Sequence, residues 1–161
     1  MMGKHLKYAL IAFLLALVQT QVMRLLSIEG ITPDLLTIWV VYVALREGQI
    51  SGTIWGFLAG LFFDLVTGNF IGLGALTKTI CGFTAGYFFQ ENKTEITLGS
   101  YRFILIVLIS ALIHTTIFFV LFTRGTDIGL MRAIFEFGLT TSLYTATITL
   151  LPMLVFSRKS V

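Results

Sequence analysis

The sequence predicts an all-α membrane protein with six transmembrane helices in a single domain, residues 1–161. Hydrophobic residues make up 57% of the chain and charged residues only 12%, about half the charged fraction of a typical soluble domain. The mean hydropathy of +0.94 points the same way. Long apolar runs recur along the whole chain, and 161 residues leave no room for a separate soluble domain.

A transmembrane helix needs about 20 mostly apolar residues. The first predicted span, residues 7–26, has a basic start like that of a signal peptide. Arg24 follows within the same pattern, however, and no small-residue cleavage site is evident. We therefore expect that this span is not cleaved off as a signal peptide.

The next two predicted spans, residues 33–46 and 50–67, are short and lie close together. One continuous helix over both would be too long for a single crossing. We expect a helical hairpin, with a re-entrant pair as the alternative. The remaining spans are predicted at residues 71–90, 101–123 and 130–156.

The placement of lysine and arginine predicts that both termini lie in the cytoplasm, because cytoplasmic loops carry an excess of these residues. In this orientation the cytoplasmic ends of the spans hold Lys4, Lys7, Arg46, Lys93, Arg102, Arg158 and Lys159. The outer ends hold Arg24, Arg124 and Arg132.

Glycines recur every four residues in the third and fourth predicted spans. Within a soluble helix each glycine costs about 1 kcal/mol relative to alanine, whereas in a bilayer this spacing lets two helix backbones touch. We expect these positions to contact another helix, either within the bundle or in a partner. The first series is Gly48, Gly52, Gly56 and Gly60, followed by Asp64; the second is Gly74, Lys78, Gly82 and Gly86.

Asp64 and Lys78 are charged residues within these two spans, joined by the short link at residues 67–70. A lysine side chain can extend along a helix toward the membrane surface. We predict an Asp64–Lys78 ion pair near the outer face. The alternative is that each side chain reaches the interface independently.

Other polar residues within the predicted spans indicate structural roles. Pro33 and Asp34 suit the first turn of a helix, where proline is tolerated and an acid complements the helix dipole. His114 has no second histidine or cysteine nearby, so we expect buried hydrogen bonding and no metal or cofactor.

No enzyme site is predicted. The sequence has no metalloprotease signature, no phosphate-binding loop and no nucleophile with an evident base. The net charge of +3 is small. The positions of the basic residues in the loops explain it better than nucleic-acid binding does.

The segment from Pro33 to Leu76 resembles the MreD family of rod shape-determining membrane proteins. It opens with Pro-Asp and contains Ala-Leu-Arg-x-Gly, Gly-Phe-x-x-Gly-x-x-x-Asp and Gly-x-Gly-Leu-x-Ala-Leu in this order. The resemblance implies a fold like that of the substrate-binding subunits of energy-coupling-factor transporters, which have six helices. It also implies a location in the bacterial inner membrane.

The same resemblance implies a non-enzymatic scaffold of cell elongation that binds MreC and helps position peptidoglycan synthesis. RodA, its transpeptidase partner and MreB would be indirect partners, and membrane lipids surround the protein. The alternative is a substrate-binding subunit of a small-molecule, vitamin-type transporter. The residues expected to contact the partner or a neighbouring helix are Gly52, Gly56, Gly60, Asp64, Pro33, Asp34, Gly82 and Gly86. Lys78 is a further candidate.

Overall fold

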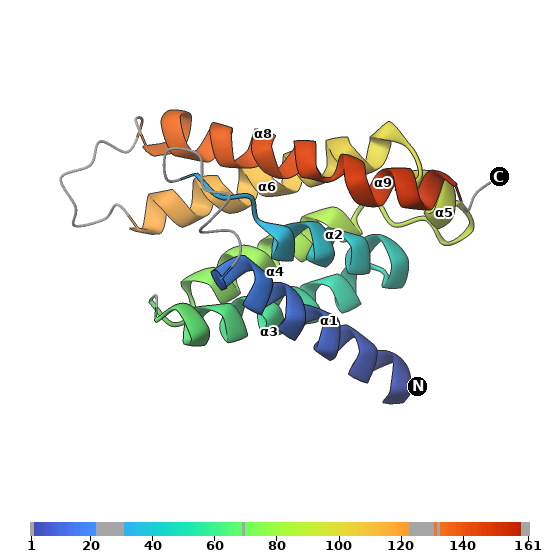
Figure 1. The fold of residues 1–161 in the computed structure, drawn as a ribbon, viewed down its shortest axis with the longest axis horizontal. Coiled ribbons are helices and arrows are strands. Elements are labelled where there is room, and N and C mark those ends of the chain that lie inside the picture. The colour runs from blue at the N-terminus through green and yellow to red at the C-terminus, as the bar shows by residue number, and fades with distance from the viewer. Residues whose placement is uncertain (1, 22–30, 69, 123–130, 132, 159–161) are drawn as a thin grey trace.

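The computed structural model describes residues 2–21, 31–68, 70–122, 131 and 133–158, and the regular elements in these residues are helices (Figure 1). They are α1 (Met2–Gln21), α2 (Leu35–Glu47), α3 (Gln49–Thr67), α4 (Leu73–Gly86), η1 (Glu91–Lys93), α5 (Thr94–Leu98), α6 (Tyr101–Phe122), η2 (Ala133–Gly138), α8 (Leu139–Ile148) and α9 (Leu150–Ser157).

The long helices alternate in direction, so the start of α1 and the end of α9 lie at the same end of the bundle (Figure 1). Two ion pairs join elements at this end. Lys4 of α1 lies 2.6 Å from Glu47 at the end of α2, and Arg46 lies 3.6 Å from Glu95 of α5. Burial raises the pKa of the Glu47 carboxyl, but hydrogen bonds from Lys4 and Tyr8, together with the positive charges of Lys4 and Arg46, hold the pKa below its usual value.

Three helical stretches in the described residues are long and apolar enough to cross a membrane: Gln49–Thr67, Tyr101–Phe122 and Ile134–Ser157. The other three predicted spans remain predictions. Two of them correspond to the short helices α2 and α4, with 13 and 14 residues. At 1.5 Å per residue these helices are about 20 Å long, less than the hydrocarbon core of a bilayer at about 30 Å.

Several predicted boundaries shift for local reasons. The fourth helix ends at Gly86 and not at residue 90, because residues 87 and 88 continue in turns. The sixth predicted span begins with a π-helical segment, η2, before the α-helical α8 and α9. Of the predicted first span, residues 22–26 lie outside the described residues, as do Arg24, Arg124 and Arg132.

The second and third helices form a helical hairpin with the break at Gly48, and its crossing of the bilayer remains a prediction. This glycine has a φ of +91°, a conformation that costs little strain without a Cβ. Its N–H donates to the carbonyl of Ala44, which closes α2. The chain then reverses at once into α3.

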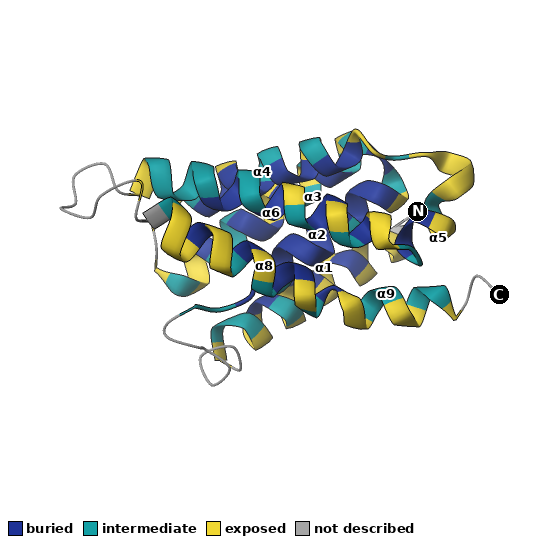
Figure 2. Ribbon diagram, turned by 90° about the horizontal axis from the view of Figure 1, so that it is seen from above, coloured by how far each residue is buried: buried dark blue, intermediate teal, exposed yellow. Residues whose placement is uncertain are grey.

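The core is built around α2. Its residues Leu36, Val40, Val41 and Val43 are fully buried, and Figure 2 shows this helix mostly in the buried colour. The outer faces of α1, α3, α6 and α9 carry large exposed apolar side chains such as Leu6, Leu65 and Leu151. An apolar core surrounded by an apolar exterior suits a bundle that lies in lipid.

The glycines of α3 and α4 face each other at backbone contact distance. A Cβ added at Gly56 would overlap the carbonyl oxygen of Lys78, and one at Gly60 would overlap the carbonyl oxygen of Gly74. A Cβ at Gly82 would meet the carbonyl oxygen of Gly52 in the same way. The two glycine series therefore join α3 to α4, as small residues do between membrane helices.

Candidate functional site: a buried polar cluster centred on Asp34

Asp34 lies directly before α2 and caps its first turn. Its Oδ1 accepts the backbone N–H of Thr37 at 3.0 Å, and its Oδ2 accepts the Thr37 hydroxyl at 2.7 Å. Aspartate is among the preferred residues at this position because it satisfies N–H groups that have no partner within the helix. The preceding Pro33 is also buried, so the start of α2 lies inside the bundle.

Lys78 of α4 forms a buried salt bridge with this aspartate. Its Nζ donates to Asp34 Oδ2 and lies 3.3 Å from the Thr37 hydroxyl. The Lys78 side chain is only 2% exposed. Its Nζ also lies 5.9 Å from the centre of the Phe63 ring, within range of a cation–π interaction.

Three further helices contribute polar groups to the same cluster. His114 Nε2 of α6 lies 3.3 Å from Asp34 Oδ2, and Gln19 Nε2 of α1 donates to Asp34 Oδ1 at 3.2 Å. The Asp34 N–H donates to the Thr145 hydroxyl of α8 at 3.0 Å. Asp34 therefore ties α2 to α1, α4, α6 and α8.

The energetics of the cluster depend on its being complete. An unpaired charge buried away from water is costly, whereas a paired and fully hydrogen-bonded one is tolerated. Several donors reach the two oxygens of Asp34, and its carboxylate gives Lys78 a direct counter-charge. The arrangement fixes how α4 and α6 are rotated against the start of α2.

The predicted Asp64–Lys78 ion pair is wrong. Asp64 is 1% exposed and instead accepts backbone N–H groups at the start of α4, from Gly72 at 2.9 Å and from Gly74 and Ala75 at 3.1 Å. These donors have no partner within α4 and carry the positive end of its dipole. They satisfy the Asp64 carboxylate, while Lys78 pairs with Asp34 at the start of α2.

The predicted contact glycines lie inside the bundle. Gly52, Gly56 and Gly60 of α3 are buried against α4, and Gly82 lies opposite Gly52. A Cβ at Gly86 would overlap the backbone of Gln49. These positions are covered by the chain itself, so of the two expected contacts, a neighbouring helix or a partner, the structure shows the neighbouring helix.

A cavity of about 200 Å³ adjoins the cluster. Its lining is mixed: polar side chains that include Asp34, Asp64, Lys78 and His114 form one part, and the rings of Phe63, Phe118 and Phe119 form another. This size and lining suit water or a small molecule with polar and apolar parts. Among the described residues, no group of three or more His, Cys, Asp or Glu side chains is placed to hold a metal ion.

Sequence reasoning missed several members of the cluster. Gln19 and Thr37 were not predicted as members, and His114 was expected only to form buried hydrogen bonds. Two signals were available in the sequence: a glutamine within an otherwise apolar first span, and the many hydroxyl side chains of the last span, Thr145 among them. Polar side chains inside a membrane bundle seek partners. Their convergence on Asp34 depends on how the helices pack.

Comparison with known proteins gives one match, which is to a family model. No curated protein and no solved structure matches the chain. The family model described as "rod shape-determining protein MreD" matches residues 4–159 of the 161 residues. Because this match covers nearly the whole chain, the protein belongs to the MreD family of rod shape-determining membrane proteins.

Proposed function

We propose that this MreD-family protein is a non-enzymatic membrane scaffold of bacterial cell elongation that binds MreC and helps position peptidoglycan synthesis. The family match over residues 4–159 carries the proposal, because it supports a role in rod shape determination. The apolar exterior of the helices and the small number of charged residues support a location in the inner membrane. RodA, its transpeptidase partner and MreB are proposed as indirect partners.

The proposed contact with MreC is a helix-on-helix contact in the bilayer, near the outer ends of α3 and α4. The glycine positions are not available there, since they are covered within the bundle. The large exposed apolar side chains at this end include Leu65, Phe70, Ile71 and Leu76. A single transmembrane helix can pack against such side chains and bury further apolar surface.

Cell shape tests the proposed function directly. In a rod-shaped bacterium depleted of its own MreD, expression of this chain is expected to restore rods. Photo-crosslinking residues at Leu65, Phe70 and Leu76 are expected to capture MreC in these cells, whereas the same probe at Leu143 of α8 serves as the control. Round cells despite normal membrane levels of the protein would contradict the role in shape. Rods without any MreC crosslink from these positions would contradict the proposed contact.

The cavity beside the Asp34 cluster favours a second candidate function, the binding subunit of a small-molecule transporter. Its lining combines carboxylate, ammonium, imidazole and hydroxyl groups with three phenylalanine rings in about 200 Å³, a mixture typical of sites that hold and orient a small ligand. Mass spectrometry of small molecules released from the purified protein tests this candidate. A stoichiometric metabolite that His114→Ala no longer retains would favour the transporter; its absence from the native protein would count against it.

A further inference from the structure

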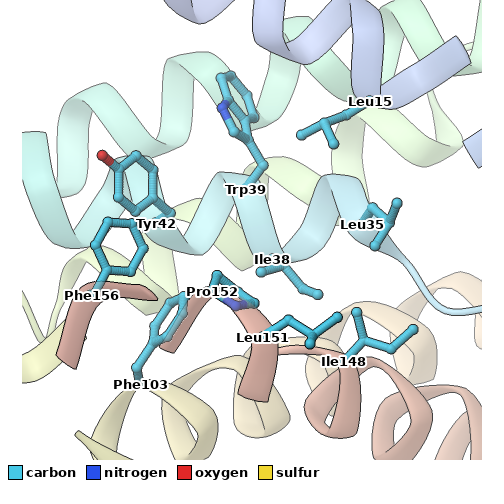
Figure 3. Close-up of a pocket in the computed structure, with 10 residues that line it drawn as sticks. All are labelled: Leu15, Leu35, Ile38, Trp39, Tyr42, Phe103, Ile148, Leu151, Pro152 and Phe156. Carbon is cyan, nitrogen blue, oxygen red and sulfur yellow. The ribbon is translucent and has the colours of Figure 1, made fainter. Parts of the chain in front are cut away.

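An apolar cavity of about 350 Å³ lies between α1, α2, α6, α8 and α9, on the side of α2 that α3 and α4 leave free (Figure 3). Leu35, Ile38 and Tyr42 line it from α2, and Leu151 and Phe156 face them from α9. Leu151 is 67% exposed, so the cavity opens on that side toward the surrounding lipid. The polar cluster at Asp34 is not part of this lining.

The lining of the cavity decides what kind of group can enter it. Apart from the Tyr42 hydroxyl and the Trp39 ring nitrogen, the side chains that line it are hydrocarbon. The hydrocarbon chain of a membrane lipid matches such a wall and brings no polar group of its own that would need a partner there.

A cation lies beyond one end of the cavity. Arg46 follows Tyr42 by about one helical turn, and its Nη1 donates to the Tyr42 hydroxyl at 2.8 Å. The Arg46 side chain is 40% exposed, and its contact with Glu95 is long, at 3.6 Å. An exposed pair of this kind contributes little, so the remaining guanidinium donors are open to an anionic group such as a phosphate.

Trp39 lies in the wall of the cavity next to Tyr42. It is 5% exposed and lines the cavity, and Figure 3 shows both rings in that wall. Its fluorescence therefore reports on a group that enters this end of the cavity.

We propose that this cavity holds one acyl chain of an anionic phospholipid, with its phosphate at Arg46. The lipid fills the space between α1 and α9 over α2 and completes the wall of the bundle. This proposal does not depend on the binding of MreC, since the site involves only this chain and the membrane.

Quenching of Trp39 fluorescence by brominated lipid tests the proposal. The chain has two tryptophans, so Trp55→Phe leaves Trp39 as the only probe. The protein is placed in phosphatidylcholine vesicles that contain a small fraction of either brominated phosphatidylglycerol or brominated phosphatidylcholine. An arginine near the membrane surface attracts anionic lipid enough to shift occupancy about fivefold, so the phosphatidylglycerol is expected to quench more strongly.

Two variants and a matched control test whether the preference for phosphatidylglycerol depends on Arg46 and on the cavity. Arg46→Gln is expected to remove the preference for phosphatidylglycerol, and Leu35→Phe is expected to remove it by filling the cavity. Arg102→Gln removes an exposed cation of α6 that does not line the cavity and should keep the preference. Equal quenching by both lipids in the parent protein, or an unchanged preference in Arg46→Gln and Leu35→Phe, would overturn the proposal.

A second measurement avoids any dependence on the Trp55→Phe background. Native mass spectrometry of the chain with both tryptophans, released from detergent, is expected to show retained phosphatidylglycerol. The same lipid should be lost from Arg46→Gln and kept by Arg102→Gln. Retention that is equal in all three proteins would contradict a site at Arg46.

Discussion

At the scale of single residues, two buried aspartates have different tasks. Asp34 holds a lysine from another helix, and Asp64 holds backbone N–H groups at the start of the helix that follows it. Both are charged groups removed from water, and each is stabilised by donors that would otherwise lack partners. Their different partners give two separate predictions.

The Asp34–Lys78 pair is expected to show strong energetic coupling. Asp34→Asn or Lys78→Met alone leaves one buried charge without its partner, which costs about 3–5 kcal/mol of stability. The double variant is expected to lose much less than the sum of the two. Denaturant unfolding in mixed micelles measures the cycle.

The same cycle with Asp64→Asn and Lys78→Met is the control. These two residues have separate partners, so their effects should add to within about 0.5 kcal/mol. Coupling in the Asp64 cycle and none in the Asp34 cycle would restore the pairing expected from the sequence.

Asp64 is expected to stabilise the start of α4 specifically. Asp64→Asn keeps one acceptor oxygen but loses the charge that faces three backbone N–H groups. The loss is expected to cost about 1–2 kcal/mol. Hydrogen exchange should become faster at the amides of Gly72, Gly74 and Ala75. Glu95→Gln, at an exposed pair, should stay within about 0.5 kcal/mol; equal losses in the two variants would contradict the capping role.

At the scale of elements, the contact between α3 and α4 depends on the absence of side chains. The carbonyl oxygens of Gly52, Gly74 and Lys78 occupy the positions where a methyl group on the facing glycine would lie. The two helices therefore approach until their backbones touch. This brings α4 close enough to α2 for Lys78 to reach Asp34.

Gly56→Ala is expected to destabilise the bundle although alanine favours helices. The added methyl group would overlap the carbonyl of Lys78, and such overpacking costs about 1–3 kcal/mol. This exceeds the gain of about 1 kcal/mol in helix propensity. Gly3→Ala in α1 is the matched control, because nothing lies within 4 Å of its Cβ position. Thermal unfolding in detergent compares the two, and equal or higher stability of Gly56→Ala would contradict the backbone contact.

At the scale of the whole molecule, the alternating helices place the two ends of the bundle on different sides. The start of α1, the end of α9 and α5 lie at one end, and the link between α3 and α4 lies at the other (Figure 1). Lys4, Arg46 and Lys93 belong to the first end. The excess of basic residues predicts that this end faces the cytoplasm.

Cysteine labelling tests this orientation. Cys81 is the only cysteine and is fully buried, so Cys81→Ser gives a background without reactive thiols. In spheroplasts, a membrane-impermeant maleimide is expected to label Phe70→Cys in the α3–α4 link but not Asn92→Cys in η1. Both residues are exposed, so disruption of the membrane should allow labelling of both. Labelling of Asn92→Cys alone in intact spheroplasts would reverse the orientation.

The helical class, the approximate helix ranges and the close contact of the glycine-containing helices were predictable from the amino-acid sequence. These features follow from local properties: hydropathy over a window, glycine spacing and the break at Gly48. The family motifs between Pro33 and Leu76 also indicated the family that the match over residues 4–159 shows.

Which charged side chains pair with each other depends on the three-dimensional packing of the helices. Asp64 is near Lys78 along the chain, but its oxygens point at the N–H groups that open α4. Lys78 points instead toward the start of α2, where Asp34 and groups from α1, α6 and α8 converge. Which partner a buried charge takes depends on helix rotation and on competition among donors, and both are set by packing between segments far apart in the chain.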